Sequence, residues 1–252
     1  MNIRHWIAKI KSFKASPISI NKKVGIEIAF DRRNRAFSVR RFFSTIEKPV
    51  KKVFNYSIDK IDSVHKSEID FLNIAVKENN DRHVRGALLY DVDTGVPYCL
   101  ELTRQNGEKP ITIFHEIGHL IDLVGVGTMG QFESENSKGI FSRLLELSKG
   151  TPEVRRLNNL LISGVIQYGG LSLPLPHRTR ITIEYLIEPR EIVARSYAQY
   201  IVEKSKSQKL HKMFQNRRND SKFGEQWSTQ NFAPLLLEWD NILNSIGWHV
   251  KK

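Results

Sequence analysis

The residues best suited to chemistry lie in the stretch ITIFHEIGHLID, residues 111–122. His115 and His119 are four positions apart, so a helix would place both imidazoles on one face, one turn apart, where they can bind the same metal ion. Glu116 would lie beside them, where it can act on a water molecule rather than on the metal. The HExxH pattern therefore predicts a zinc site with a general base.

The residues around this pattern favour a buried helix, because they are apolar on several sides: Ile113, Phe114, Ile117, Leu120, Ile121 and Val124. Two histidines and a glutamate on a buried helix require partners, and a divalent cation supplies them. Gly118 is a poor helix former, so its presence indicates a close neighbour. Asp122, one turn after His119, is either placed to orient a ligand imidazole or an ordinary polar position.

A catalytic zinc site requires a third protein ligand and an open position. A third histidine six residues after His119 would complete the site locally, but that position is Gly125. The third ligand must then come from another element. Glu191, in the stretch EYLIEPREIVARSYAQYI at 184–201, is the best candidate.

We choose Glu191 because it lies inside the helix predicted from Pro189 to about Lys204. Ala194 and Ala198 follow Glu191 on one helical face, and such small residues permit close approach of another helix. Glu188 is the alternative ligand, although its position suits the N-cap of this helix better.

These residues carry a family resemblance. HEIGHLID with PREIVARSYAQYI resembles the gluzincin metallopeptidases, in which HExxH is completed by a glutamate on a later helix. Two branches are most similar: the zincin-like domain of phage head-morphogenesis (Mu F-type) proteins, and the catalytic domain of anthrax lethal factor. The likeness covers about residues 85–247. It implies a zincin-like fold and hydrolysis of peptide bonds.

The resemblance also implies roles for single residues. Zn²⁺ would be held by His115, His119 and Glu191, with Glu116 as general base and the zinc-activated water as nucleophile. In the lethal-factor-like branch, a tyrosine shortly before the glutamate ligand stabilises the transition state. Tyr185 is the nearest match, one residue closer to the ligand than the family spacing. Alternatives are Tyr168, Tyr197 and a purely structural tyrosine.

Composition limits the class of protein. The chain has 252 residues, of which 40% are apolar and 26% charged, as in a globular protein with a proper core. No apolar run is long enough for a transmembrane segment, and lysines interrupt the first 14 residues, which therefore lack a signal-peptide core. The single Cys99 excludes an internal disulfide and fits a reducing compartment. We expect a cytoplasmic protein in the producing cell, with signal-independent export into a host cell left open.

The net charge of +12 is concentrated at one end. Residues 1–53 carry 14 Lys and Arg against three acidic residues, a net of +11, whereas residues 54–252 carry 25 against 24, a net of +1. This predicts a basic N-terminal segment at 1–53 and a zincin-like metallopeptidase domain at 54–252. The segment is either a solvated extension or docks on nucleic acid, an anionic membrane surface or an acidic partner.

The hydrophobic patterns predict an α+β fold with a small antiparallel sheet packed on a mostly helical half that carries the active-site helix. Expected strands are 24–30, 36–39, 71–76, 86–92 and 97–102, with a turn at 93–95. Expected helices are 57–66, 112–125, 140–148, 151–170, 189–204 and 229–246, with a loop at 171–180 and irregular structure at 206–226. The hairpin before the 112–125 helix would offer an exposed strand to an extended peptide.

Together these patterns predict a zinc-dependent endopeptidase acting on a protein or peptide. Two settings fit: a phage or mobile-element protein, and a bacterial effector or toxin. The alternative is a non-catalytic binding module on a zincin scaffold, docking nucleic acid or an acidic partner through residues 1–53. Glu116 favours the enzyme, because a structural zinc site needs no general base.

Overall fold

The computed structural model describes residues 37–67, 72–80, 85–103, 109–127, 131–168, 170–220, 226–248 and 250. Their elements in chain order are η1 (Val39–Phe42), β1 (Phe43–Ile46), α2 (Lys48–Val64), β2 (Ile74–Asn79), β3 (Gly86–Tyr90), β4 (Pro97–Thr103), α3 (Lys109–Leu120), η2 (Ile121–Gly125), η3 (Glu133–Glu135), α4 (Ser142–Lys149), α5 (Pro152–Ser163), β5 (Val165–Tyr168), β6 (Leu171–Pro174), α6 (His177–Leu186), α7 (Pro189–Lys204), α8 (Gln208–Asp220) and α9 (Thr229–Ser245). The fold is α+β, as predicted. None of the helices in the described ranges is long and apolar enough to cross a membrane.

The main sheet has four strands in the order β1-β2-β4-β3. β1 and β4 both pair parallel with β2, whereas β3 pairs antiparallel with β4. The sheet is therefore mixed, and the prediction of an antiparallel sheet was wrong. The reason is α2, which returns the chain from β1 to the start of β2 and so makes these strands parallel. The predicted hairpin of β3 and β4 is confirmed, and it leaves β3 at an edge of the sheet.

The predicted basic segment reaches into this fold. β1 belongs to the sheet, and α2 continues through residues 53 and 54, with Val50 and Phe54 both fully buried. A boundary between residues 53 and 54 would divide a helix whose apolar face is buried, so residues 37–53 are part of the main body. The expected strand 24–30 lies outside the described residues. The expected strand 36–39 was wrong in its described part, because Val39 begins η1.

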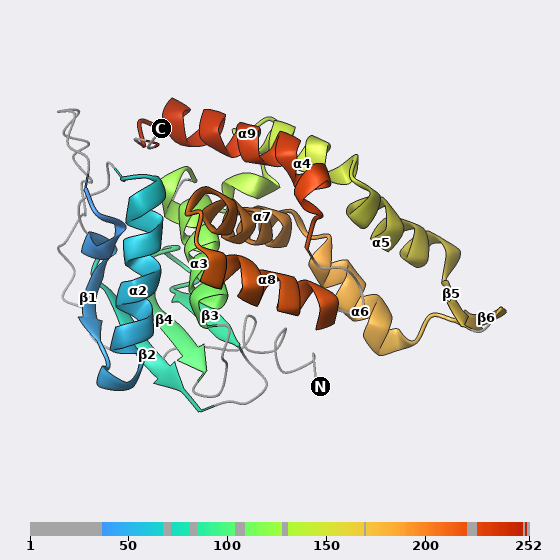
Figure 1. Cartoon of the computed structure of the whole chain (residues 1–252), viewed down its shortest axis with the longest axis horizontal. Coiled ribbons are helices and arrows are strands. Elements are labelled where there is room, and N and C mark those ends of the chain that lie inside the picture. Colours follow the sequence, from blue (N-terminus) through green and yellow to red (C-terminus); the bar gives the residue numbers. More distant parts are fainter. Residues whose placement is uncertain are drawn as a thin grey trace.

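Two helices occupy the centre of the molecule (Figure 1). α3 packs on the sheet, beside α2, and α7 packs along its other side. Every residue of α7 from Glu191 to Val202 is buried, because α4, α8 and α9 also contact this helix. Aromatic side chains fill the space around it, with Tyr197, Tyr200 and Trp239 in mutual ring contact. α3 and α7 are thus held on all sides by the main core.

A second, smaller core lies between α5 and α6, and its buried members are Leu157, Leu175, Ile183 and Leu186. We call residues 152–186, from α5 to α6, the arm. The arm extends away from α3 and α7, with the hairpin β5–β6 at its far end (Figure 1). The predicted helix to residue 170 and loop at 171–180 were wrong. α5 ends at Ser163 because Gly164 adopts a left-handed conformation, with φ of 64°, and the hairpin follows.

The remaining helix predictions differ in accuracy. α7 has the predicted bounds. The helix with the HExxH pattern was expected to begin at Thr112, but α3 already includes Lys109 and Pro110. The π-helical turn η2 continues α3 and ends at Gly125, where the helix was predicted to end. The polar stretch 206–226, expected to be partly irregular, contains α8.

Candidate metal centre

The backbones of α3 and α7 nearly touch at the site. A Cβ atom added to Gly118 would lie 2.7 Å from the Cα atom of Ala194, so only glycine fits at this crossing. The close neighbour expected beside Gly118 is therefore present, and Ala194 provides the small face expected on the later helix. This approach brings the side chains near the crossing on each helix within reach of one another.

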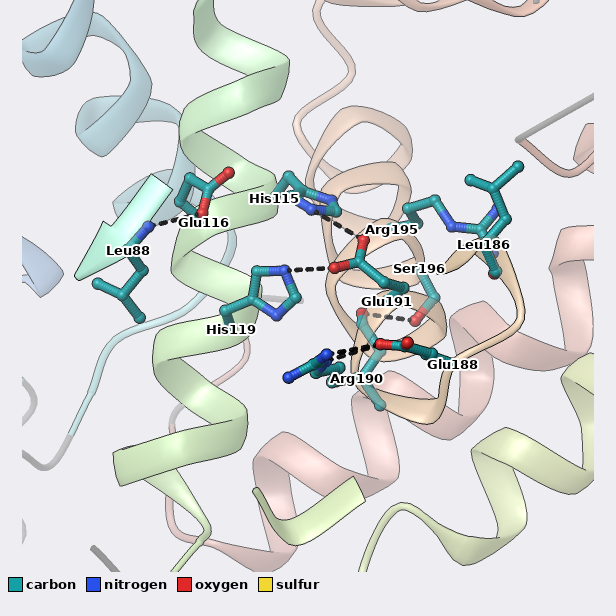
Figure 2. A network of polar contacts seen from close by, with 11 residues as sticks. Leu88, His115, Glu116, His119, Leu186, Glu188, Arg190, Glu191, Arg195 and Ser196 are labelled. Carbon is teal, nitrogen blue, oxygen red and sulfur yellow. Dashed lines mark hydrogen bonds and ion pairs between the residues drawn. The ribbon is translucent and has the colours of Figure 1, made fainter. Parts of the chain in front are cut away.

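His115, His119 and Glu191 meet between the two helices (Figure 2). Nε2 of His115 lies 3.4 Å from one carboxylate oxygen of Glu191, and Nε2 of His119 lies 3.2 Å from the other. The two imidazole rings are edge to face, with centroids 4.8 Å apart. The histidine side chains are 13% and 11% exposed and that of Glu191 is 3% exposed, so the cluster is nearly buried but open on the histidine side.

The spacing and charge of this cluster suit a divalent cation. Two donors of a tetrahedral zinc ion, each about 2.0–2.1 Å from the metal, are about 3.4 Å apart. Each imidazole nitrogen lies near this distance from a different oxygen of Glu191, and one donor atom from each residue lies within 4.8 Å of the others. Burial disfavours the charge on Glu191, but the positive charge of His119 and hydrogen bonds from both imidazoles outweigh it and hold the pKa of this carboxyl well below its usual range. A carboxylate that stays ionised beside two imidazoles provides the donor types and the negative charge that Zn²⁺ binds.

Glu116 lies on the side of α3 that faces the edge strand β3 (Figure 2). One carboxylate oxygen accepts a hydrogen bond of 3.0 Å from the backbone N–H of Leu88. The side chain is buried, and this burial raises the pKa of its carboxyl. Gly86 allows β3 to approach, because a Cβ there would lie 2.5 Å from the methyl group of Thr112 and 3.2 Å from a Glu116 oxygen. Glu116 is thus separate from the ligand cluster, as expected of a base.

Tyr185 lies at the end of α6, next to the site. Burial, the charge of Glu191 and a hydrogen bond to that carboxylate raise the pKa of its phenol well above the usual value, so the hydroxyl keeps its proton and can donate it. The two alternatives are placed elsewhere. Tyr168 is 76% exposed on the hairpin of the arm, and the hydroxyl of Tyr197 lies 2.7 Å from Nε2 of His65 in the main core.

Asp122 is hydrogen-bonded to Ser134 rather than to the imidazole of His119. Both of its carboxylate oxygens accept hydrogen bonds from Ser134, one from the backbone N–H at 2.7 Å and one from the hydroxyl at 2.5 Å. Nδ1 of His119 is buried without a hydrogen-bond partner in the described part of the chain. Asp122 therefore fixes the segment around η3 beside the site. Glu188, the alternative ligand, is the N-cap residue of α7 and pairs with Arg190 at 2.7 Å.

Several residues at the site carry no motif that sequence analysis detects. Phe132 packs edge to face against both Tyr90 and His119, and the guanidinium of Arg190 lies 5.9 Å from its ring centroid. Arg195, one turn after Glu191, is buried and donates a hydrogen bond to the backbone carbonyl of Leu186. The spacing of four from Glu191 was the only available signal for Arg195; for Phe132 there was none, because it comes from a loop.

Comparison with known proteins finds no relative of this chain. No family model, no curated protein and no solved structure matches the chain. The functional argument therefore depends on the residues and geometry of the site.

Proposed function

We propose that the protein is a zinc-dependent endopeptidase of the gluzincin type. The observation that carries the proposal is the meeting of His115, His119 and Glu191, with donor atoms within 4.8 Å of one another, beside a buried carboxylate that is not a member of the cluster. A structural zinc site would use its residues as ligands alone and would have no need of Glu116.

The chain's own residues supply the remaining chemistry. When bound, zinc contributes Lewis acidity at the scissile carbonyl and at the attacking water. Glu116, whose pKa is raised by burial, takes the proton of that water and passes it to the leaving amine. The N–H of Leu88 holds one oxygen of Glu116 in place, which leaves the other for proton transfer. The protonated phenol of Tyr185 donates a hydrogen bond to the oxyanion.

The sheet favours an extended polypeptide as substrate. β3 is an edge strand, and Glu116 contacts it through Leu88. An edge strand offers backbone N–H and C=O groups to which an extended peptide can add as a further strand; on β3 the N–H of Leu88 is already bonded to Glu116, so the peptide would pair with the other groups. A peptide bound in this way would pass the carboxylate of Glu116 and the ligand cluster on the same side of the strand.

Substitution of ligand and base tests the proposal. Glu191→Ala should lose stoichiometric zinc. Glu116→Gln should keep zinc, because its amide oxygen still accepts the Leu88 N–H, yet lower proteolysis by about 10²–10⁴-fold through loss of the base. Zinc is measured by atomic absorption, and proteolysis by mass spectrometry of the products from a protein mixture.

Glu188→Ala is the matched control, since this glutamate precedes α7 but bonds Arg190 instead of the histidines. It should keep zinc. Stoichiometric zinc in Glu191→Ala would remove the third ligand, and unchanged proteolysis by Glu116→Gln would exclude the proposed mechanism.

A further inference from the structure

The hairpin at the end of the arm has one uniformly apolar face. Cross-strand partners point to the same side of a two-stranded ribbon, and the pairs are Ile166 with Leu173 and Tyr168 with Leu171. These two pairs share a face because they are separated by one residue on each strand. The opposite face carries the pair Val165 and Pro174 and the polar pair Gln167 and Ser172, whose side chains are hydrogen-bonded at 2.8 Å. The polar side chains of the two strands, apart from the Tyr168 hydroxyl, are therefore confined to one face.

The apolar face is uncovered in the described structure. Tyr168 is 76% exposed, Leu171 is 65% exposed and Leu173 is 43% exposed; Ile162, just before the hairpin, is 84% exposed. Only Ile166 packs partly against the small core of the arm. An isolated two-stranded ribbon is marginally stable by itself. Its exposed large apolar side chains therefore indicate that another surface covers this face.

The charge of the arm is mostly positive. Residues 152–186 contain four arginines and two acidic residues, Glu153 and Glu184, and the stretch 154–183 between these two has the arginines alone. Arg155, Arg156 and Arg178 are exposed. Arg180 lies at the base of the hairpin, where its guanidinium would be 3.6 Å from a Cβ atom on Gly164. A partner that binds this end of the arm should therefore have an apolar interior for the leucines and a negatively charged surface for the arginines.

We propose that the hairpin β5–β6 is a peripheral membrane contact, with its apolar face inserted at the boundary of headgroups and acyl chains in an anionic bilayer. Interfacial elements insert about 5–10 Å, which suits a ribbon of four residues per strand. A protein interface, in contrast, uses about 800 Å² on each partner, more than four apolar side chains provide. Tyrosine at the edge of the patch also fits this boundary, because its ring is apolar and its hydroxyl polar.

Adjacent labels on opposite faces of β6 test the proposal directly. Cys99 is buried, and this burial raises the pKa of its thiol to about 11, so it stays unlabelled at neutral pH. Leu173→Cys places a nitrobenzoxadiazole label on the apolar face, and Ser172→Cys places it on the polar face. With vesicles of phosphatidylcholine and phosphatidylglycerol, the label at 173 should brighten and shift to the blue, and the label at 172 should not.

Vesicle co-sedimentation of the full chain gives an independent test. Leu171→Ser should weaken binding to the anionic vesicles by roughly tenfold, because it removes an inserted side chain. Its matched control is Leu237→Ser on α9, where the leucine is 63% exposed and lies outside the arm; binding should stay within about twofold. Arg178→Gln should weaken binding by about fivefold.

Three outcomes would overturn the proposal. Equal responses of both labels, or of neither, would exclude face-specific insertion. Unchanged binding by Leu171→Ser would assign membrane affinity to another part of the chain. A lipid-free dimer that Leu171→Ser converts to a monomer, measured by light scattering, would identify a second copy as the occupant. Glu116→Gln should bind vesicles like the wild type, so this proposal and the proposed peptidase activity can fail separately.

Discussion

Glu116 and Glu191 lie in one site, but their surroundings drive the pKa values of the two carboxyls apart. Burial raises the pKa of Glu116, whereas Glu191, despite its burial, is kept ionised by His119 and His115. A metal ligand must stay negatively charged, and a base must have an affinity for protons close to that of the group it serves. The two environments therefore match the two proposed roles.

Removal of the Tyr185 hydroxyl tests the proposed role of this side chain in stabilising the oxyanion. Tyr185→Phe should lower kcat by roughly 10²-fold, because the oxyanion loses a hydrogen-bond donor, while zinc content and KM stay the same. Steady-state kinetics on the zinc-loaded protein measure this. Tyr168→Phe, on the exposed hairpin, serves as the control. A normal kcat with weaker zinc binding would instead assign Tyr185 to orienting Glu191.

The three residues of the cluster could be singled out from the sequence, and their supporting contacts could not. His115 and His119 follow from helical periodicity, and Glu191 from the small residues after it. Asp122 could not be assigned, because its partner Ser134 is 12 positions away on a loop. Leu88 was equally hidden, since the contact of its N–H with Glu116 depends on the approach of β3 at Gly86.

At the scale of elements, the contact between Gly118 and Ala194 sets the distance between α3 and α7. Gly118→Ala would gain about 1 kcal/mol of helix propensity. The new Cβ atom, however, would lie 2.7 Å from a backbone atom of α7, and overpacking of this kind typically costs about 1–3 kcal/mol. We therefore expect a net loss of stability and, because the ligands are on both helices, about tenfold weaker zinc binding.

Denaturant unfolding and competition with a zinc chelator measure these two effects. Gly150→Ala is the control, because Gly150 has a φ of −71° and lies at the end of α4. It should leave zinc affinity unchanged. Normal zinc affinity in Gly118→Ala would mean that the helix crossing does not set the ligand geometry.

Helix predictions were accurate where the local signal at an end stands out from its surroundings, and inaccurate where an apolar run continues beyond that signal, as it does after Gly164. Pro189 and the N-cap position of Glu188 define the start of α7. The stretch 165–174, in contrast, has a short apolar run that periodicity cannot assign to helix or strand. The parallel pairing of β1 and β2 was also unpredictable, because it depends on the length and packing of α2.

At the scale of the whole molecule, His65 connects three distant parts of the chain. Its backbone pairs with Val250, its Nε2 lies 2.7 Å from the hydroxyl of Tyr197, and its ring contacts Trp248. Burial lowers its pKa from 6.5 to about 3. Between these values the unfolded chain binds a proton that the folded chain excludes, so stability falls as the pH falls below 6.5.

This linkage predicts a loss of about 2 kcal/mol of unfolding free energy from His65 alone between pH 8 and pH 5. His65→Gln should remove that part of the pH dependence, and His177→Gln, at an exposed position, should follow the wild type. Urea unfolding with a chelator present measures the difference without a contribution from metal binding. Equal pH slopes for the wild type and His65→Gln would contradict the prediction.

The arm has its own small core, and Tyr185 packs on that core rather than on the main one. The proposed zinc ligands and base, in contrast, are carried by α3 and α7. Small units with few buried side chains open locally at a lower free energy than a main core. We therefore expect local opening of the arm to withdraw the phenol of Tyr185 while the three residues of the cluster stay together. The proposed activity would then follow the opening equilibrium of the arm rather than the global unfolding of the protein.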